Sequence, residues 1–171
     1  MYIYCICHFN LVFITLYIVQ IGISMNTTRI DYNKVAPDAV KALLPLEGYV
    51  QKSSLEKTLL ELVKLRASQI NGCAYCVDIH TQDARKQGES ERRLHAVAVW
   101  KHSPLFTERE RAALAWTEAI TLISESEAPD AIYNEVIKSF NEKETVDLTI
   151  AIIAINSWNR LAVGFQKLPR E

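Results

Sequence analysis

The sequence predicts a single domain built from α-helices. Its 171 residues suffice for one domain with a sizeable hydrophobic core and are too few for two of ordinary size. After Pro37 the apolar residues recur at intervals of three and four, the period of a helix, rather than alternating as in a strand. Only five glycines and five prolines interrupt the chain. These three observations favour an all-α fold.

Composition narrows the class of protein. Hydrophobic residues make up 49% of the chain, charged residues 23%, and the formal net charge is −1, which is typical of soluble globular proteins. A protein that binds nucleic acid or an acidic membrane surface usually has an excess of basic residues. We therefore expect no nucleic acid partner.

The first 24 residues, "MYIYCICHFNLVFITLYIVQIGIS", form a separate segment without Lys, Arg, Asp or Glu. An apolar stretch of about 20 residues is long enough to span a bilayer. A signal peptide needs positive charge before its apolar run, whereas the first basic residue here is Arg29. We predict that residues 1–24 are an extension from a mis-assigned start codon and that the domain comprises 25–171. A membrane anchor and a cleaved signal are the alternatives.

Helices are expected from "PDAVKALL", which begins at Pro37 and should stop at Pro45, and from the run that follows Ser54, "LEKTLLELVKLRASQI". In the second of these, charged residues are expected on the face opposite the apolar one. Asn71 and Gly72 accept a left-handed backbone and should end it. The apolar face comprises Leu55, Leu59, Leu62, Val63 and Ile70.

Further helices follow along the chain. One runs from Cys73 to about Gln87, and Ser90 fits the N-cap of "ERRLHAVAVW". The segment "TERE" has the capping-box pattern before "RAALAWTEAITLI". After Pro129 come "DAIYNEVIKSF" and "TVDLTIAIIAINSWNRLAVGF". The last is apolar nearly all round, so we expect it at the centre of the bundle or between subunits, with Asn156 and Arg160 as polar anchors at a subunit contact.

The stretch "INGCAYCVDIH" concentrates the reactive side chains. At about 100° per residue, Cys73, Cys76 and His80 fall within roughly a 60° arc of one helix. His80 lies one turn after Cys76 and can act as its base, and a helix N-terminus favours a thiolate. A second cysteine one turn away can trap a sulfenic acid as a disulfide. Glu61, twelve positions before Cys73, can point toward this face if the two helices form a hairpin.

Two other interpretations of this stretch remain open from spacing alone. Cys73, Cys76, His80 and Glu61 could together form a closed four-ligand zinc site, although structural zinc usually draws its ligands from two such pairs. Alternatively the cysteines are small buried hydrophobes, His80 is a core histidine and Glu61 is a solvated charge.

The stretch from Leu59 to Thr121 resembles the AhpD-like alkylhydroperoxidases of the carboxymuconolactone decarboxylase superfamily. The residues that carry the resemblance are a Glu, a C-x-x-C beginning twelve positions later, and a His four positions past the second Cys. Similarity continues through "INSWNRLAVGF". The resemblance implies an AhpD-like helical bundle assembled as a homo-oligomer, commonly a trimer or a hexamer.

The resemblance also implies a function, that of a thiol-dependent peroxidase or disulfide oxidoreductase. Cys76 would be the peroxidatic cysteine and Cys73 the resolving one, with His80 and Glu61 as the proton relay and with no cofactor or metal. The substrate would be a hydroperoxide and the reductant a dithiol of thioredoxin or lipoyl type. A cysteine pair that must be reduced again in each cycle fits the cytoplasm best. Members of the superfamily that decarboxylate lactones, and a non-catalytic redox- or zinc-responsive oligomeric protein, are the alternative functions.

One position departs from the AhpD pattern. AhpD enzymes with a well-developed relay have a second histidine directly before the second cysteine, where this chain has Tyr75. A phenol does not titrate near neutral pH and cannot replace an imidazole as a base. We expect the departure to weaken peroxide turnover more than disulfide exchange.

Overall fold

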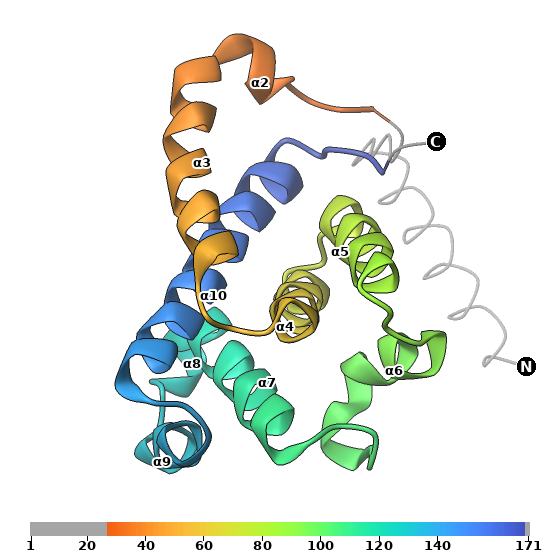
Figure 1. Cartoon of the computed structure of the whole chain (residues 1–171). Helices are drawn as coiled ribbons and strands as arrows, with labels where there is room; N and C mark the ends of the chain where they lie inside the picture. The colour runs from red at the N-terminus through yellow and green to blue at the C-terminus, as the bar shows by residue number, and fades with distance from the viewer. Residues whose placement is uncertain (1–26, 170–171) are drawn as a thin grey trace, which may run out of the picture.

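The structure is a computed structural model that describes residues 27–169. In this range it consists of helices packed into one bundle, with no strand (Figure 1). The predicted all-α fold is therefore confirmed. The segment 1–24, for which we expected a mis-assigned start, lies outside the described residues.

The predicted helices occur in the expected order along the chain, and the structure adds the short helices α2 and α8, which the sequence did not predict. They are α2 (Tyr32–Val35), α3 (Pro37–Lys52), α4 (Lys57–Ile70), α5 (Ala74–Lys86), α6 (Glu91–Ala96), the 3₁₀ helix η1 (Val97–His102), α7 (Glu108–Thr121), α8 (Ile123–Ser126), α9 (Asp130–Ser139) and α10 (Glu142–Gly164).

Helices α4 and α10 form the centre of the bundle. Figure 1 shows α4 nearly end-on between α5, α7 and α10, and α10 contacts α3, α4, α5, α7 and α9. Among the described residues, α10 is the one helix long and apolar enough to cross a membrane. Half of its most apolar stretch is buried inside the bundle. Its central position agrees with the sequence.

The expectation of a charged, solvent-facing side on α4 is wrong in the middle of the helix. Every residue from Leu59 to Leu65 is buried, including the charged Glu61 and Lys64. The reason is that α4 is packed by α5, α7 and α10 on different sides, so its central turns have no solvent face. Burying these charges requires partners, which makes the two residues conspicuous.

The prediction that Pro45 ends its helix is also wrong, because α3 continues through it to Lys52. A proline inside a helix removes one backbone hydrogen bond and crowds the preceding turn. Packing compensates here, since Val50 beyond the proline is 1% exposed in the main core and Leu46 packs against that core. Pro45 itself is on the exposed side of the helix.

The turns and caps largely follow the sequence. Gly72 and Gly88 have positive φ values of 65° and 89°, and Thr107 and Glu110 form the predicted capping box. The segment after Ser90 departs from expectation, because α6 ends at Ala96 and continues as the 3₁₀ helix η1.

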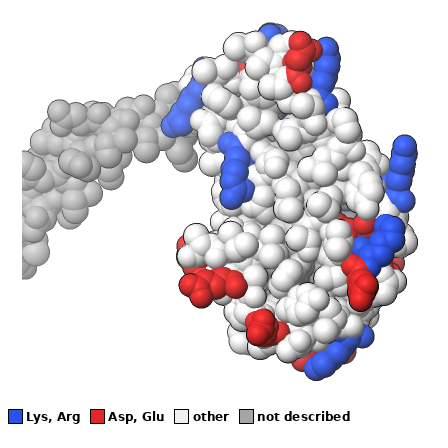
Figure 2. All heavy atoms as spheres, turned by 90° about the vertical axis from the view of Figure 1, so that its left-hand side faces the viewer, with Lys and Arg blue, Asp and Glu red and all other residues white. Residues whose placement is uncertain are grey.

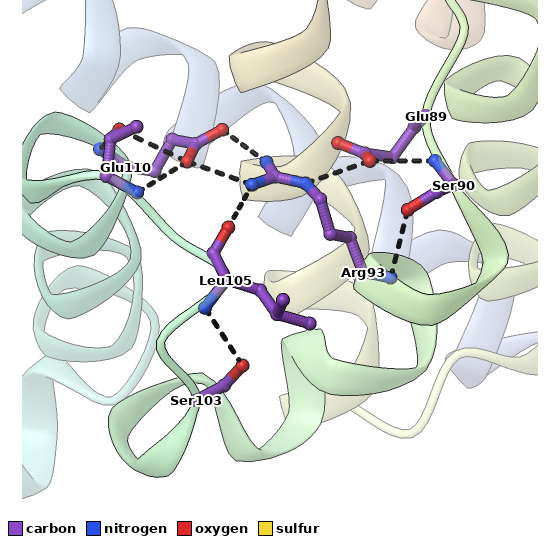
Figure 3. A network of polar contacts seen from close by, with 7 residues as sticks. Glu89, Ser90, Arg93, Ser103, Leu105 and Glu110 are labelled. Atoms are coloured by element: carbon purple, nitrogen blue, oxygen red, sulfur yellow. Dashed lines mark hydrogen bonds and ion pairs between the residues drawn. The ribbon is translucent and has the colours of Figure 1, made fainter.

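An arginine joins the start of α6 to the start of α7 (Figure 3). Arg93 Nε donates to Glu89 at 2.9 Å, and its guanidinium also binds Glu110 and the backbone oxygen of Leu105. The hydroxyl of Ser90 accepts the Arg93 backbone N–H at 3.3 Å, which confirms the predicted N-cap. These contacts hold the η1 loop against the side of α4, where Trp100 and Phe106 are buried.

Candidate functional site

The C-x-x-C stretch begins at the turn between α4 and α5. Gly72 provides the left-handed residue of this turn, and the backbone N–H of Cys73 donates to the oxygen of Ser68 at 2.9 Å. Cys73 is the N-cap of α5, one residue before the helix, and its sulfur accepts the backbone N–H of Cys76 at 3.3 Å. Cys73 therefore does not lie in the first helical turn, where we had expected both cysteines.

A buried polar network from α10 fixes this turn. The side-chain amide of Asn71 donates to Asn156 Oδ1 and Asn159 Oδ1, both at 2.9 Å. Asn159 in turn donates to Ser68 Oγ at 3.1 Å. The anchoring role predicted for Asn156 is thus exercised within this chain, on the turn that carries the cysteines. The sequence predicted for Asn71 only a role in ending the helix and predicted none for Asn159, because only the fold brings these side chains together.

The two cysteines are joined as a Cys73–Cys76 disulfide, with Cα atoms 5.3 Å apart. They are 2% and 3% exposed and pack with Ala162 of α10. Cys76 lines a cavity of about 510 Å³, whereas Cys73 is not among its lining residues. The walls of this cavity come from α2, α3, α4, α5, α10 and Lys167 near the C-terminus.

Glu61 and His80 meet in the same cavity. Glu61 Oε2 lies 2.8 Å from His80 Nδ1, and their side chains are 10% and 14% exposed. A carboxylate can only accept a hydrogen bond, so this contact leaves the proton on Nδ1 and makes Nε2 the nitrogen able to take another. In the described part of the chain no hydrogen bond links His80 to either sulfur. The fold thus brings together all four candidate residues, whose catalytic roles remain predictions.

Lys64 is a cavity residue that we missed from the sequence. Its ammonium group lies 2.7 Å from Glu47 Oε1 of α3 and 3.5 Å from Glu61 Oε1, and its side chain is 2% exposed. Burial alone would raise the pKa of Glu47, but the charge of Lys64 and its hydrogen bond hold it below its ordinary value. The sequence signal that could have identified Lys64 is its position three residues after Glu61, in a run from Leu59 to Leu65 that is otherwise apolar.

Tyr75 faces a lysine from the C-terminal segment. Lys167 Nζ lies 4.3 Å from the centre of the Tyr75 ring and 5.1 Å from that of Tyr32. Burial alone would lower the pKa of Lys167, but hydrogen bonding to Tyr75 and Tyr32 raises it. Tyr75 is therefore engaged with a cation at the cavity wall, and it offers no second imidazole beside Cys76.

A possible cation site in this cavity does not involve the sulfurs. Ligand atoms of Glu61, His80 and Asp83 lie within 4.8 Å of one another. The two oxygens of Glu61 already face the ammonium of Lys64 and the ring of His80. Because a positive charge is built into this position, the donor set favours a proton relay over a metal ion.

Comparison with known proteins identifies the class. The carboxymuconolactone decarboxylase family matches residues 37–119, which include all four candidate residues. The Bacillus subtilis protein YdfG, itself uncharacterized, is 42% identical over 136 residues, covering 80% of this chain and 92% of YdfG. The chain belongs to the AhpD-like branch of the carboxymuconolactone decarboxylase superfamily.

Solved structures agree with this assignment. A protein of unknown function from Agrobacterium tumefaciens, described as a candidate AhpD antioxidant defence protein, is 48% identical, with a TM-score of 0.83 over 85% of this chain and 99% of that one. The debrominase Bmp8 has a TM-score of 0.70 at 20% identity, over 78% of this chain and 72% of its own. At 20% identity, the similarity to Bmp8 concerns the fold alone.

Proposed function

We propose that the protein is a thiol-dependent peroxidase or disulfide oxidoreductase that reduces hydroperoxides through Cys73 and Cys76. The observation that carries the proposal is the cavity into which Cys76, one half of a disulfide, opens beside the paired Glu61 and His80. Cys73 lies behind it, within bonding distance of its sulfur. This arrangement supports Cys76 as the attacking sulfur and Cys73 as the resolving one.

The proposed cycle starts from the reduced protein. His80 Nε2 takes the proton of the Cys76 thiol, and the thiolate attacks one oxygen of the hydroperoxide. The O–O bond breaks, and the departing alkoxide takes the proton from His80 and leaves as an alcohol. Cys73 then attacks the sulfenic acid on Cys76, the disulfide forms, and water leaves. A partner dithiol reduces the disulfide and is itself oxidised, which returns two electrons.

The test is an intact-mass measurement on reduced protein before and after one equivalent of an organic hydroperoxide, with peptide mapping. We expect a loss of about two mass units, located to a Cys73–Cys76 bridge. Cys73→Ser should instead gain about 16 mass units at Cys76, because its sulfenic acid cannot be resolved. Rapid peroxide consumption by Cys76→Ser would overturn the proposal.

The two alternative functions have distinct outcomes. A lactone decarboxylase would not need the cysteine pair, so a Cys73→Ser/Cys76→Ser double variant that decarboxylates a carboxylactone would favour it. A zinc-responsive assembly protein would bind one zinc ion per chain in its reduced form. The disulfide at the cavity favours neither of these outcomes.

We also propose a homo-oligomer in a reducing compartment. The side of the molecule formed by α3, α10 and α9 is mostly free of charge, as Figure 2 shows. The exposed large apolar residues on these helices fit burial against a second copy. A disulfide that must be reduced in each cycle favours the cytoplasm and a thioredoxin- or lipoyl-type dithiol as partner. The exposed large apolar residues on α3, α9 and α10 that would be covered by a second copy are Leu44, Tyr49, Tyr133, Ile137, Val146, Ile153 and Val163.

A further inference from the structure

We propose that Lys64 is a positioning residue of the peroxidase site, the centre of a charge chain that runs from Glu47 through Lys64 and Glu61 to His80. The inference rests on the proposed function and adds to it a group that does not touch the reacting sulfur. The charge chain joins residues of three helices, since Glu47 lies on α3, Lys64 and Glu61 on α4, and His80 on α5.

The two carboxylate oxygens of Glu61 face different neighbours. Oε1 faces Lys64 Nζ at 3.5 Å, and Oε2 faces His80 Nδ1 at 2.8 Å. Lys64 has a second carboxylate, Glu47, at 2.7 Å. Because one oxygen of Glu61 is attracted by a fixed ammonium, the other stays aimed at the imidazole.

Burial makes this arrangement energetically significant. Lys64 is 2% exposed, and a buried ammonium is strongly unfavourable unless carboxylates surround it. With a neutral imidazole, Glu47, Lys64 and Glu61 sum to one negative charge. When His80 takes the thiol proton, the charge chain becomes neutral and the negative charge passes to the Cys76 thiolate, so Glu61 stabilises the imidazolium that forms. Asp83 and Lys167 are further charged groups that line the cavity.

Loss of the lysine charge would leave the buried carboxylate of Glu61 and the partly exposed carboxylate of Glu47 on either side of an uncharged side chain. Glu61 would then lose the contact that fixes its orientation, and His80 Nδ1 would lose a well-placed acceptor. The predicted consequence is slower proton transfer from Cys76. The effect of Lys64 should therefore depend on the presence of His80.

A double-mutant cycle between Lys64 and His80 tests this dependence. The rate of Cys76 oxidation by an organic hydroperoxide is measured by stopped flow in the wild type, Lys64→Met, His80→Gln and the double variant. We expect Lys64→Met to slow oxidation about tenfold when His80 is present and less than about twofold when it is Gln. Equal slowing in both backgrounds would show a merely structural role and overturn the proposal.

Two further variants keep the proposal testable if Lys64→Met does not fold. Lys64→Arg retains the charge, and Lys64→Gln retains polarity without charge. We expect Arg to keep the rate within about threefold and Gln to lose about tenfold; equal rates would overturn the proposal. Lys57→Met, an exposed lysine on the same helix, is the matched control and should behave as the wild type.

A second readout separates this inference from the proposed function. Alkylation of Cys76 by iodoacetamide, followed by peptide mass spectrometry in a Cys73→Ser background, reports thiolate formation without any peroxide. If the wild type reduces no hydroperoxide, the proposed function fails, while the same Lys64–His80 coupling in alkylation would still support the charge chain. Absence of coupling in alkylation, with peroxide reduction intact, would refute the charge chain alone.

Discussion

Tyr75 is the residue at which the cavity departs from the AhpD pattern described above. It lies directly before Cys76 and holds the ammonium of Lys167 against its ring. The phenol therefore stabilises the wall formed by the C-terminal segment, whereas an imidazole at this position could exchange a proton with substrate. The presence of tyrosine instead of histidine changes one side chain of the cavity, and the pair of Glu61 and His80 is still present.

We predict that Tyr75→His raises the rate of Cys76 oxidation several-fold, because a second base beside the sulfur shortens the path of the proton. The rate is measured by stopped flow with an organic hydroperoxide. Tyr75→Phe, which keeps the ring but not the hydroxyl, is the control and should stay within about twofold of the wild type. A histidine variant no faster than the phenylalanine variant would contradict the prediction.

The carboxylate of Glu118 on α7 is held by three hydrogen-bond donors. Burial would raise the pKa of its carboxyl group, but Lys101, Trp100 and Arg66 donate to it and together hold the pKa below the ordinary 4.5. A lowered folded-state pKa stabilises the fold above pH 4.5, and this stabilisation is lost as the pH falls through the folded-state value.

Glu118→Gln should therefore reduce the free energy of unfolding at pH 7 by about 2 kcal/mol. Urea unfolding at several pH values measures the difference between variant and wild type. We expect it to shrink progressively below pH 4.5. A difference independent of pH would show that the carboxylate charge contributes nothing.

At the scale of elements, packing overrides local preference in α3 and α4. Pro45 lies inside a helix that its sequence should end, and Glu61 and Lys64 are buried on a helix that should expose its charges. In each case contacts with neighbouring helices compensate for the unfavourable local sequence. For α3 it is the core contact of Val50, and for α4 it is Glu47 and His80 as charge partners.

Pro45→Ala is expected to stabilise the protein by about 1 to 2 kcal/mol, because alanine restores a helical N–H and is the better helix former. The gain is less than the full proline penalty, since proline also restricts the unfolded chain. Urea unfolding checks the value, and the exposed Ala42→Pro on the same helix should do the reverse. Lower stability in Pro45→Ala would mean that the present course of α3 needs the proline.

At the scale of the whole molecule, one side of the bundle is still apolar at its surface. Ile153 of the central helix α10 is 44% exposed and Val146 is 57% exposed. Helix α10 thus contributes some residues to the inner core and presents apolar side chains outward with others. This combination supports the proposed homo-oligomer.

Ile153→Arg should shift the protein to a smaller species, because a charge would be buried at the subunit contact. Size-exclusion chromatography with light scattering measures the mass. The control is Val99→Arg, since Val99 is 59% exposed on η1, away from α10. A wild type that is monomeric at working concentrations would refute the oligomer.

The sequence by itself determined the all-α class, most of the longer helices, several caps and the family, because apolar spacing, capping residues and the C-x-x-C with its Glu and His are local signals. It also indicated the four candidate residues, although the pairing of Glu61 with His80 depended on two helices forming a hairpin. Only the tertiary structure decided that Cys76 lines the cavity, that Asn156 and Asn159 hold the turn, and that Lys64 joins the relay. These contacts join residues far apart in the chain, and their stability comes from burial, which no local pattern encodes.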